Sequence, residues 1–157
     1  LEETFNGDKV AATAELMTRY FRTHGPATLH DFAWWAKLPQ RLIRPAAENL
    51  APDIMRCGEV SQDLVSAEIV EMAEARKKQS VLLLGAFDEY ILGYQDRLFA
   101  MTKEVHEVLV PGNRGVFRRA IVVDGQVRGT WNKQDIEDLG MPGYAMREVQ
   151  KLWRDAH

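Results

Sequence analysis

Apolar residues recur with the period of an α-helix in three consecutive stretches of the first 50 residues, and this pattern constrains the fold more than any other feature of the sequence. The first stretch, 7–25, ends at Gly25, which is a typical helix stop. Four residues make its apolar face: Val10, Ala14, Met17 and Phe21. The second stretch, 26–38, predicts a short helix, because Thr28 can cap its start and Asp31 stands at the reciprocal position of a capping box.

The third stretch, 39–50, begins at Pro39, which suits the first turn of a helix. Four of its polar residues would face away from the apolar side: Gln40, Arg41, Arg44 and Glu48. Pro45 should kink this helix or begin a new one, because a proline inside a helix costs about 3 kcal/mol. Three helices with a short break before the third match a helix-turn-helix, in which the third helix reads DNA.

The segment 53–70 can supply the two strands of a wing, with Gly58 near the bend. We therefore predict a winged helix-turn-helix domain over 1–75, with Gln40, Arg41 and Arg44 as candidate DNA-binding residues. A second interpretation stays open. Three amphipathic helices occur in many proteins, and exposed arginines usually only solvate a surface.

The second half of the chain predicts strands. VLLLGAF, 81–87, has the continuous apolar run of a buried strand. VFRRAIVVDGQVRGTW, 116–131, predicts a β-hairpin, because Asp124-Gly125 is a strong signal for a two-residue turn. Between them, 102–115 predicts a short helix and then a glycine-rich loop.

The last stretch, 141–157, predicts a closing helix with Met146, Val149 and Trp153 facing inward. The second domain, over 76–157, should therefore be a small hairpin or partial-barrel unit with a C-terminal helix. The fold class expected for the whole chain is α+β.

Four ordered blocks between residues 8 and 131 resemble the bacterial winged-helix DNA-binding proteins related to AlkZ-like DNA glycosylases. The blocks are ATLHDFAWWAKL, FDEYILGYQDR, VPGNRGVFR and VVDGQVRGTW. The resemblance implies tandem winged-helix units followed by a small β-barrel-like domain. It also implies double-stranded DNA as a partner, and glycosylase members of the family remove alkylated bases and unhook interstrand crosslinks.

By the same resemblance, this chain looks like the C-terminal portion of a longer protein, with further winged-helix domains upstream. The catalytic signature of the family is a glutamine, an apolar residue, and then a glutamine or aspartate. No such triplet occurs here, since SQD (61–63) and YQD (94–96) place two polar residues side by side. We therefore expect the catalytic residues to lie upstream and this chain alone to have no glycosylase activity. The residues after Trp131 do not resemble the further strands of the family, which leaves closure of the barrel open.

The charged cluster in GAFDEYILGYQDR, 85–97, could be either a catalytic site or the means of holding a turn. Asp88 and Glu89 would point to opposite faces of a strand, and in a helical turn that Asp88 could cap they would still not converge. Glycosidic chemistry uses a pair of facing carboxylates. We therefore favour a structural role, with Asp96-Arg97 as a local ion pair that anchors the loop.

The loop PGNRGVFRR, 111–119, is the second candidate contact with a phosphate backbone. Gly112 and Gly115 let the main chain approach closely, and Arg114 supplies charge. Arg118 and Arg119 would point to opposite faces of the following strand, so we expect at most one, Arg118, to join the site. A flexible loop with solvated arginines is an equally good interpretation.

Composition limits the other functions. A net charge of -3 argues weakly against nucleic acid and favours the alternative of a non-enzymatic winged-helix regulator or protein-interaction module. The four histidines and the single cysteine, Cys57, lack the spacing of a metal site, and no cofactor motif is present. Neither a signal peptide nor a membrane-spanning run is visible, and we expect a cytoplasmic protein.

Overall fold

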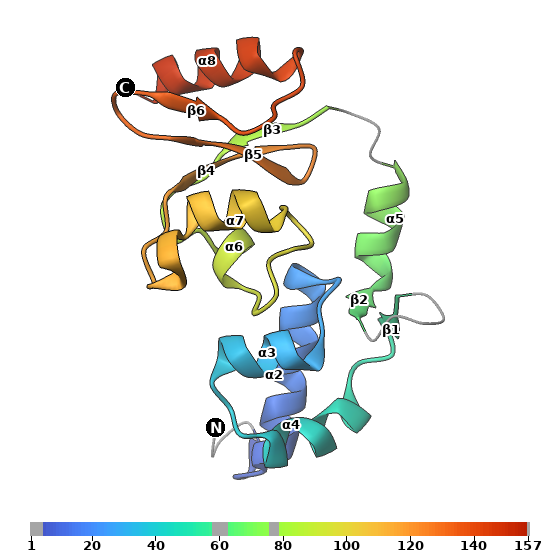
Figure 1. Ribbon diagram of the computed structural model, residues 1–157. Coiled ribbons are helices and arrows are strands. Elements are labelled where there is room, and N and C mark those ends of the chain that lie inside the picture. Colours follow the sequence, from blue (N-terminus) through green and yellow to red (C-terminus); the bar gives the residue numbers. More distant parts are fainter. Residues whose placement is uncertain (1–4, 58–62, 76–78, 157) are drawn as a thin grey trace. The chain divides into compact units, whose positions relative to one another are not determined.

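The computed structural model describes residues 5–57, 63–75 and 79–156 (Figure 1). It divides into two compact units. Unit 1 comprises Leu1–Lys77 together with Gly93–Gln95, and unit 2 comprises Lys78–Leu92 and Asp96–His157. Helices and antiparallel sheets occur together, so the predicted α+β class is confirmed. Among the described residues, no helix has the length and apolar character that crossing a membrane requires.

Unit 1 begins with three helices at the predicted places: α2 (Lys9–His24), α3 (Leu29–Ala36) and α4 (Gln40–Ala46). Asp8 caps α2, since its Oδ1 accepts hydrogen bonds from the backbone N–H groups of Val10 and Ala11. The capping box at the start of α3 is confirmed. Thr28 Oγ1 accepts from the backbone N–H of Asp31, whose Oδ2 in turn accepts from the backbone N–H of Thr28.

Proline controls both ends of α4. Pro39 takes the N-cap position, one residue before the expected first turn. Pro45 lies in the last turn, and the α-helix ends one residue later, at Ala46. The chain continues as a single 3₁₀ turn, η1 (Ala47–Asn49). Pro45 itself lies inside α4, so the kink or new helix start expected there stays a prediction.

A short antiparallel hairpin follows, made of β1 (Ile54–Arg56) and β2 (Leu64–Ser66). The predicted strand beyond Ser66 is wrong, because Ala67–Ala75 forms helix α5. Ser66 Oγ accepts a hydrogen bond from the backbone N–H of Ile69, and the alanines and glutamates that follow favour a helix. Gly58, the expected bend, lies outside the described residues.

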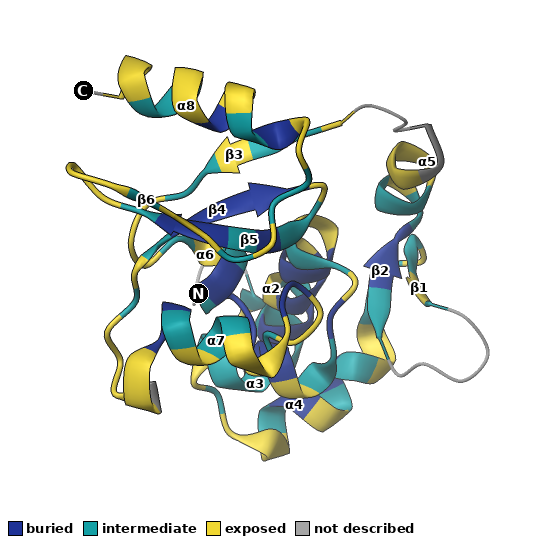
Figure 2. Ribbon diagram, turned by 45° about the horizontal axis from the view of Figure 1, so that its top comes forward, coloured by how far each residue is buried: buried dark blue, intermediate teal, exposed yellow. Residues whose placement is uncertain are grey.

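The core of unit 1 gathers the apolar faces of its three helices (Figure 2). Its largest fully buried side chains are Met17, Tyr20, Phe21, Phe32 and Ile43. Hydrogen bonds attach the segment Gly93–Gln95 to these helices. Tyr20 Oη donates to the Gly93 carbonyl at 2.7 Å, Tyr94 Oη donates to the His24 carbonyl at 2.5 Å, and the Gln95 N–H donates to Asp31 Oδ1 at 2.9 Å.

Unit 2 contains a four-stranded antiparallel sheet in the order β3 (Val81–Leu83), β4 (Arg119–Val123), β5 (Gln126–Trp131) and β6 (Ile136–Asp138). The predicted hairpin is confirmed, with Asp124 and Gly125 at φ of 49° and 78° in its turn. β3 is an edge strand in which Leu82 is 49% exposed, so the prediction of a buried strand is wrong. Because β3 and β6 each pair with one neighbour, the described strands form an open sheet.

Helices cover both faces of this sheet (Figure 1). On one face, α8 (Ala145–Asp155) packs Ala145 and Val149 against Ile121 and Val123. Val149 is buried as predicted, but Met146 and Trp153 remain half-buried. The other face carries α6 (Glu89–Leu92), α7 (Lys103–Leu109) and the 3₁₀ turn η2 (Pro111–Asn113), as the sequence predicts for 102–115.

Candidate nucleic-acid interface

The outer face of α4 presents the three predicted contact residues of unit 1. Gln40, Arg41 and Arg44 are all exposed, and their spacing of three and four residues places them on one side of the helix. The opposite side is anchored by Ile43 and Ala46, both 0% exposed. Neither arginine forms an ion pair with another residue in the described part of the chain. Two positive charges therefore lie together on one face of α4.

The glycine-rich loop of unit 2 presents Arg114. Gly112 and Gly115 have φ of 64° and 74°, a region that glycine adopts without strain. The Arg114 side chain folds back over Gly112, where an added Cβ would lie 3.4 Å from its Nε. Arg114 is exposed at the end of η2, so its guanidinium is accessible to an anion.

Arg118 and Arg119 have partners of different kinds. Arg118 Nη1 lies 3.1 Å from Glu137 Oε2, which compensates part of its charge. The guanidinium of Arg119 lies 4.8 Å from the ring centroid of Trp131. The partners of these arginines agree with the prediction that they point to opposite faces. Arg118 bonds Glu137, which pairs with Thr130 in the ladder, whereas Arg119 lies over Trp131, which belongs to the cluster on the α8 face. Both residues border one hollow at the end of the sheet.

Two of the acidic residues at 88–97, Asp88 and Asp96, hold turns. Asp88 Oδ1 accepts from the backbone N–H of Tyr90 and caps α6, and Asp96 Oδ1 accepts from the backbone N–H of Leu98. Arg97 Nε donates to the Ile91 carbonyl at 3.0 Å, and burial lowers the pKa of its guanidinium. These contacts agree with a structural role. The Asp96-Arg97 ion pair itself stays a prediction.

Two adjacent tryptophans occupy different environments. Trp35 packs in the core cluster of unit 1, with its ring 5.1 Å from that of Tyr20. Trp34 carries the Lys37 ammonium 4.0 Å above its ring. In the described part of the chain, no group of three histidine, cysteine or acidic side chains is placed to hold a metal ion.

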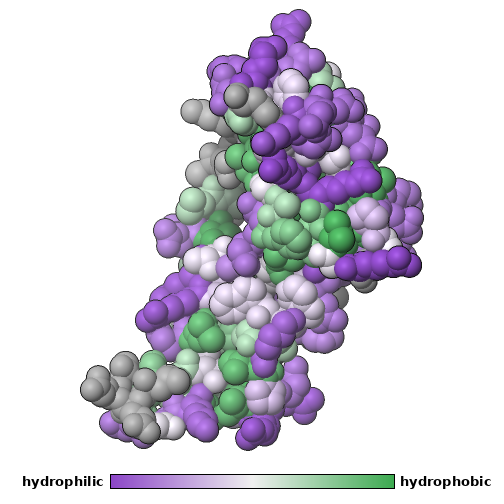
Figure 3. Space-filling view, turned by 90° about the vertical axis from the view of Figure 1, so that its left-hand side faces the viewer, coloured by the Kyte–Doolittle hydropathy of each residue, from purple (hydrophilic) through white to green (hydrophobic). Residues whose placement is uncertain are grey.

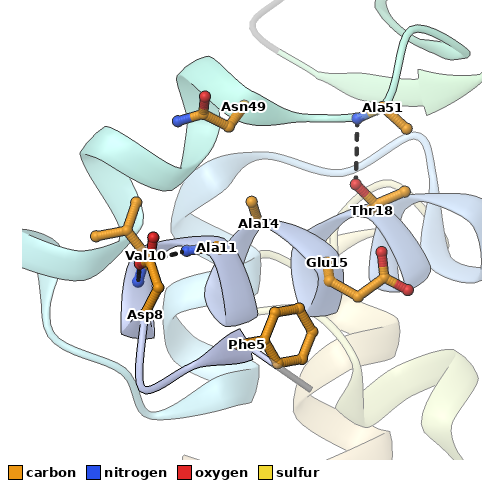
Figure 4. Close-up of a pocket in the computed structure, with 9 residues that line it drawn as sticks. All are labelled: Phe5, Asp8, Val10, Ala11, Ala14, Glu15, Thr18, Asn49 and Ala51. Atoms are coloured by element: carbon orange, nitrogen blue, oxygen red, sulfur yellow. Dashed lines mark hydrogen bonds between the residues drawn. The ribbon is translucent and has the colours of Figure 1, made fainter. Parts of the chain in front are cut away.

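Another hollow, of about 380 Å³, lies along α2 and the turn that follows η1 (Figure 4). Its acidic groups already have partners. Asp8 caps the helix and Glu15 Oε1 lies 2.7 Å from Arg19 Nε. Thr18 Oγ1 accepts from the Ala51 N–H at 3.3 Å. This hollow therefore offers no reactive group.

Sequence reasoning missed two features of the site. Asp31 was expected only to cap a helix, yet its second oxygen binds residue 95. The hollow beside Arg118 was not expected either, because its walls come from segments up to 51 residues apart and no local pattern connects them.

The chain was compared with known protein families and solved structures. A family model described as DNA glycosylase AlkZ-like matches residues 3–138. Among solved structures, the Streptomyces sahachiroi DNA glycosylase AlkZ matches with a TM-score of 0.74 and 22% sequence identity. The match covers 90% of this chain and 41% of that one, so this chain spans less than half of that protein. At this identity the likeness shows a shared fold. A search of curated proteins found no match.

Proposed function

Because this chain belongs to the DNA glycosylase AlkZ-like family, we propose that it is a DNA-binding portion of a repair glycosylase. In this proposal unit 1 is a winged helix-turn-helix, α4 is its recognition helix, and the hairpin of β1 and β2 is its wing. The residues that release the base lie outside these 157 residues. The observation that carries the proposal is the exposed face of α4, where Arg41 and Arg44 lie together beside Gln40.

The physical chemistry of this face suits a phosphate backbone. Most contacts between proteins and DNA go to phosphates, and arginine binds them with two parallel hydrogen bonds. Arg114 is the corresponding cation of unit 2, on a loop whose glycines let the main chain approach an anion. Arg118 is a weaker candidate, since a phosphate would have to compete with Glu137 at 3.1 Å.

The test is the affinity for a duplex over a series of salt concentrations. Each phosphate contact contributes about 0.9 to the slope of log affinity against log salt. Replacing Arg41 and Arg44 with alanine should therefore flatten the slope by roughly two units and weaken binding on any sequence. Arg114→Ala should flatten it by about one unit.

A matched control separates contact from net charge. Arg147 and Arg154 lie exposed on α8, and replacing both with alanine takes the net charge from -3 to -5, as the α4 double variant does. This control should keep the wild-type slope. Equal slopes for the wild type and the α4 variant would show that these arginines do not meet DNA.

The same proposal predicts no base release by this chain. A duplex containing an alkylated base should stay intact, and the variants Asp88→Asn and Glu89→Gln should behave like the wild type. Measured release that either variant abolishes would overturn this assignment. The net charge of -3 favours the alternative of a non-enzymatic regulator or protein-interaction module. The absence of duplex binding at low salt would support that alternative.

A further inference from the structure

The hollow at the start of β4 is a feature of unit 2 that the proposed function does not use. Its volume is about 570 Å³, inside the range of about 300–1,000 Å³ that is common for ligand sites. Three separate segments of unit 2 line it: Ala86, Phe117, Arg118, Arg119, Thr130, Trp131, Asn132, Asp135 and Glu137. The open sheet thus brings two aromatic rings, two arginines and several hydrogen-bonding groups to one place.

The charges in the hollow balance. Arg118 and Arg119 face two acids, Asp135 and Glu137, and Arg118 is paired with Glu137 at 3.1 Å. A phosphate would meet both carboxylates, and like charges repel at this range. The hollow therefore suits a polar group without a net negative charge.

Flat surfaces are held rigidly in its walls. Trp131 Nε1 donates to the Leu84 carbonyl at 2.9 Å, which fixes the ring, and the Arg119 guanidinium lies over that ring. Phe117 is held by the Arg97 guanidinium, 5.1 Å from its ring centroid, and by the ring of Phe87 at 5.5 Å. Aromatic rings and guanidinium planes are the surfaces on which unpaired nucleobases stack.

The backbone at Phe87 supports a role for this edge. Phe87 adopts a φ of 63°, which is strained for a residue with a side chain, and its side chain is 56% exposed. Val116, next to Phe117, is 59% exposed. Figure 3 shows that exposed apolar side chains form a patch on the face that it views, bordered by hydrophilic ones.

The hollow also offers a donor and an acceptor. Glu137 Oε2 accepts from Arg118 and Thr130, and within the described residues its Oε1 has no partner. Asn132 Oδ1 accepts from the backbone N–H groups of residues 134 and 135, which leaves its Nδ2 as a donor with no partner in the described part of the chain. A nucleobase edge carries complementary acceptors and donors.

We propose that this hollow binds an unpaired nucleobase of the DNA, stacked on the Phe117, Trp131 and Arg119 surfaces. The inference rests on the proposed function for the source of the base. Arg114, three residues before Phe117, would hold the adjacent phosphate outside the hollow.

The first experiment compares two duplexes of the same sequence, one fully paired and one with a single bulged thymine, by fluorescence anisotropy. The wild type should bind the bulged duplex about 5- to 150-fold more tightly, the range that stacking of one base provides. Ala86→Phe fills the hollow from an exposed position, and Phe117→Leu removes a ring while it keeps apolar volume. For each variant, the affinities for the bulged and the paired duplex should agree within about twofold, because stacking of the base is lost. The affinity of each variant for the paired duplex should equal that of the wild type, because the phosphate contacts remain.

Phe99→Leu is the matched control. Phe99 is 46% exposed and packs against Tyr90, whose Oη donates to the Gly125 carbonyl at the opposite end of the β4–β5 hairpin. This variant should keep the preference for the bulge. A wild type without that preference would overturn the inference, and so would a preference that survives in both hollow variants.

A second measurement does not depend on duplex binding. Titration of the ¹⁵N-labelled protein with the single strand dT4 should shift the indole N–H resonance of Trp131, which Trp131→Phe identifies by its loss. Ala86→Phe should abolish the shift. If no duplex binds but this shift occurs, the proposed duplex interface fails and the nucleobase site stands. If the α4 arginines set the salt slope but dT4 leaves the Trp131 resonance unmoved, the nucleobase site fails alone.

Discussion

Replacement of Asp31 with alanine should destabilise unit 1 far more than the loss of a helix cap normally does. Asp31 is 6% exposed, and its side chain accepts hydrogen bonds from Thr28 and Gln95. Its Oδ2 accepts from Thr28 N at 3.0 Å and from Thr28 Oγ1 at 2.7 Å, and its Oδ1 accepts from Gln95 N at 2.9 Å. One carboxylate therefore starts α3 and also holds Gly93–Gln95 against the helices of unit 1.

The magnitude follows from these contacts. Loss of the capping box alone costs about 1 kcal/mol. An N–H group left buried and unpaired, here that of Gln95, costs about a further 1–3 kcal/mol. We expect Asp31→Ala to lower the free energy of unfolding by about 3 kcal/mol, which corresponds to about 10 °C in Tm for a chain of this size.

The assay is thermal and urea unfolding followed by circular dichroism, with Asp8→Ala as the control. Asp8 also caps a helix, but it is exposed and its bonds stay within the first turn of α2. That variant should cost about 1 kcal/mol. Hydrogen exchange provides the local readout, because the amide of Gln95 should lose protection in Asp31→Ala and keep it in Asp8→Ala. Equal losses of stability in the two variants, with Gln95 still protected, would refute the reasoning.

Two further predictions concern unit 2. Gly129→Ala should destabilise the sheet by about 2 kcal/mol, because the added Cβ would lie 2.6 Å from the Glu137 carbonyl oxygen. Gly85→Ala is the control, since its Cβ would meet no atom within 4 Å. The free energy of unfolding of this control should stay within about 0.5 kcal/mol of the wild type in the same assay. The Tyr144 hydroxyl donates to Asp124 and lowers the pKa of that carboxyl. The ionised Asp124 carboxylate therefore stabilises the folded state at pH values above the ordinary pKa of aspartate. This stabilisation is lost as the pH falls through the lowered pKa. Tyr144→Phe should raise the pKa of Asp124 in an NMR titration and make unfolding less sensitive to acid; an unchanged pKa would show that the hydroxyl is not its cause.

Local signals were sufficient for much of the fold. The capping box at Thr28 and Asp31, the turn at Asp124-Gly125 and the end of α4 one residue after Pro45 each depend on hydrogen bonds or steric contacts within about four residues. Contacts between residues so close along the chain can be predicted from the local sequence alone. The outward face of α4 was predictable for the same reason, since helical spacing alone separates Arg41 and Arg44 from the buried side of the helix.

The tertiary structure determined which strands pair and which side chains contact each other across distant segments. VLLL has the composition of a central strand, but β3 received a single neighbour, and Leu82 is consequently half exposed. Arg118 was predicted as a DNA-binding residue, yet β6 places Glu137 beside it, 19 residues further along the chain. Gly93–Gln95 joins unit 1 through bonds that span 64 to 73 residues. No local period encodes contacts of that separation, because they depend on how whole elements pack and on which buried polar groups remain to be satisfied.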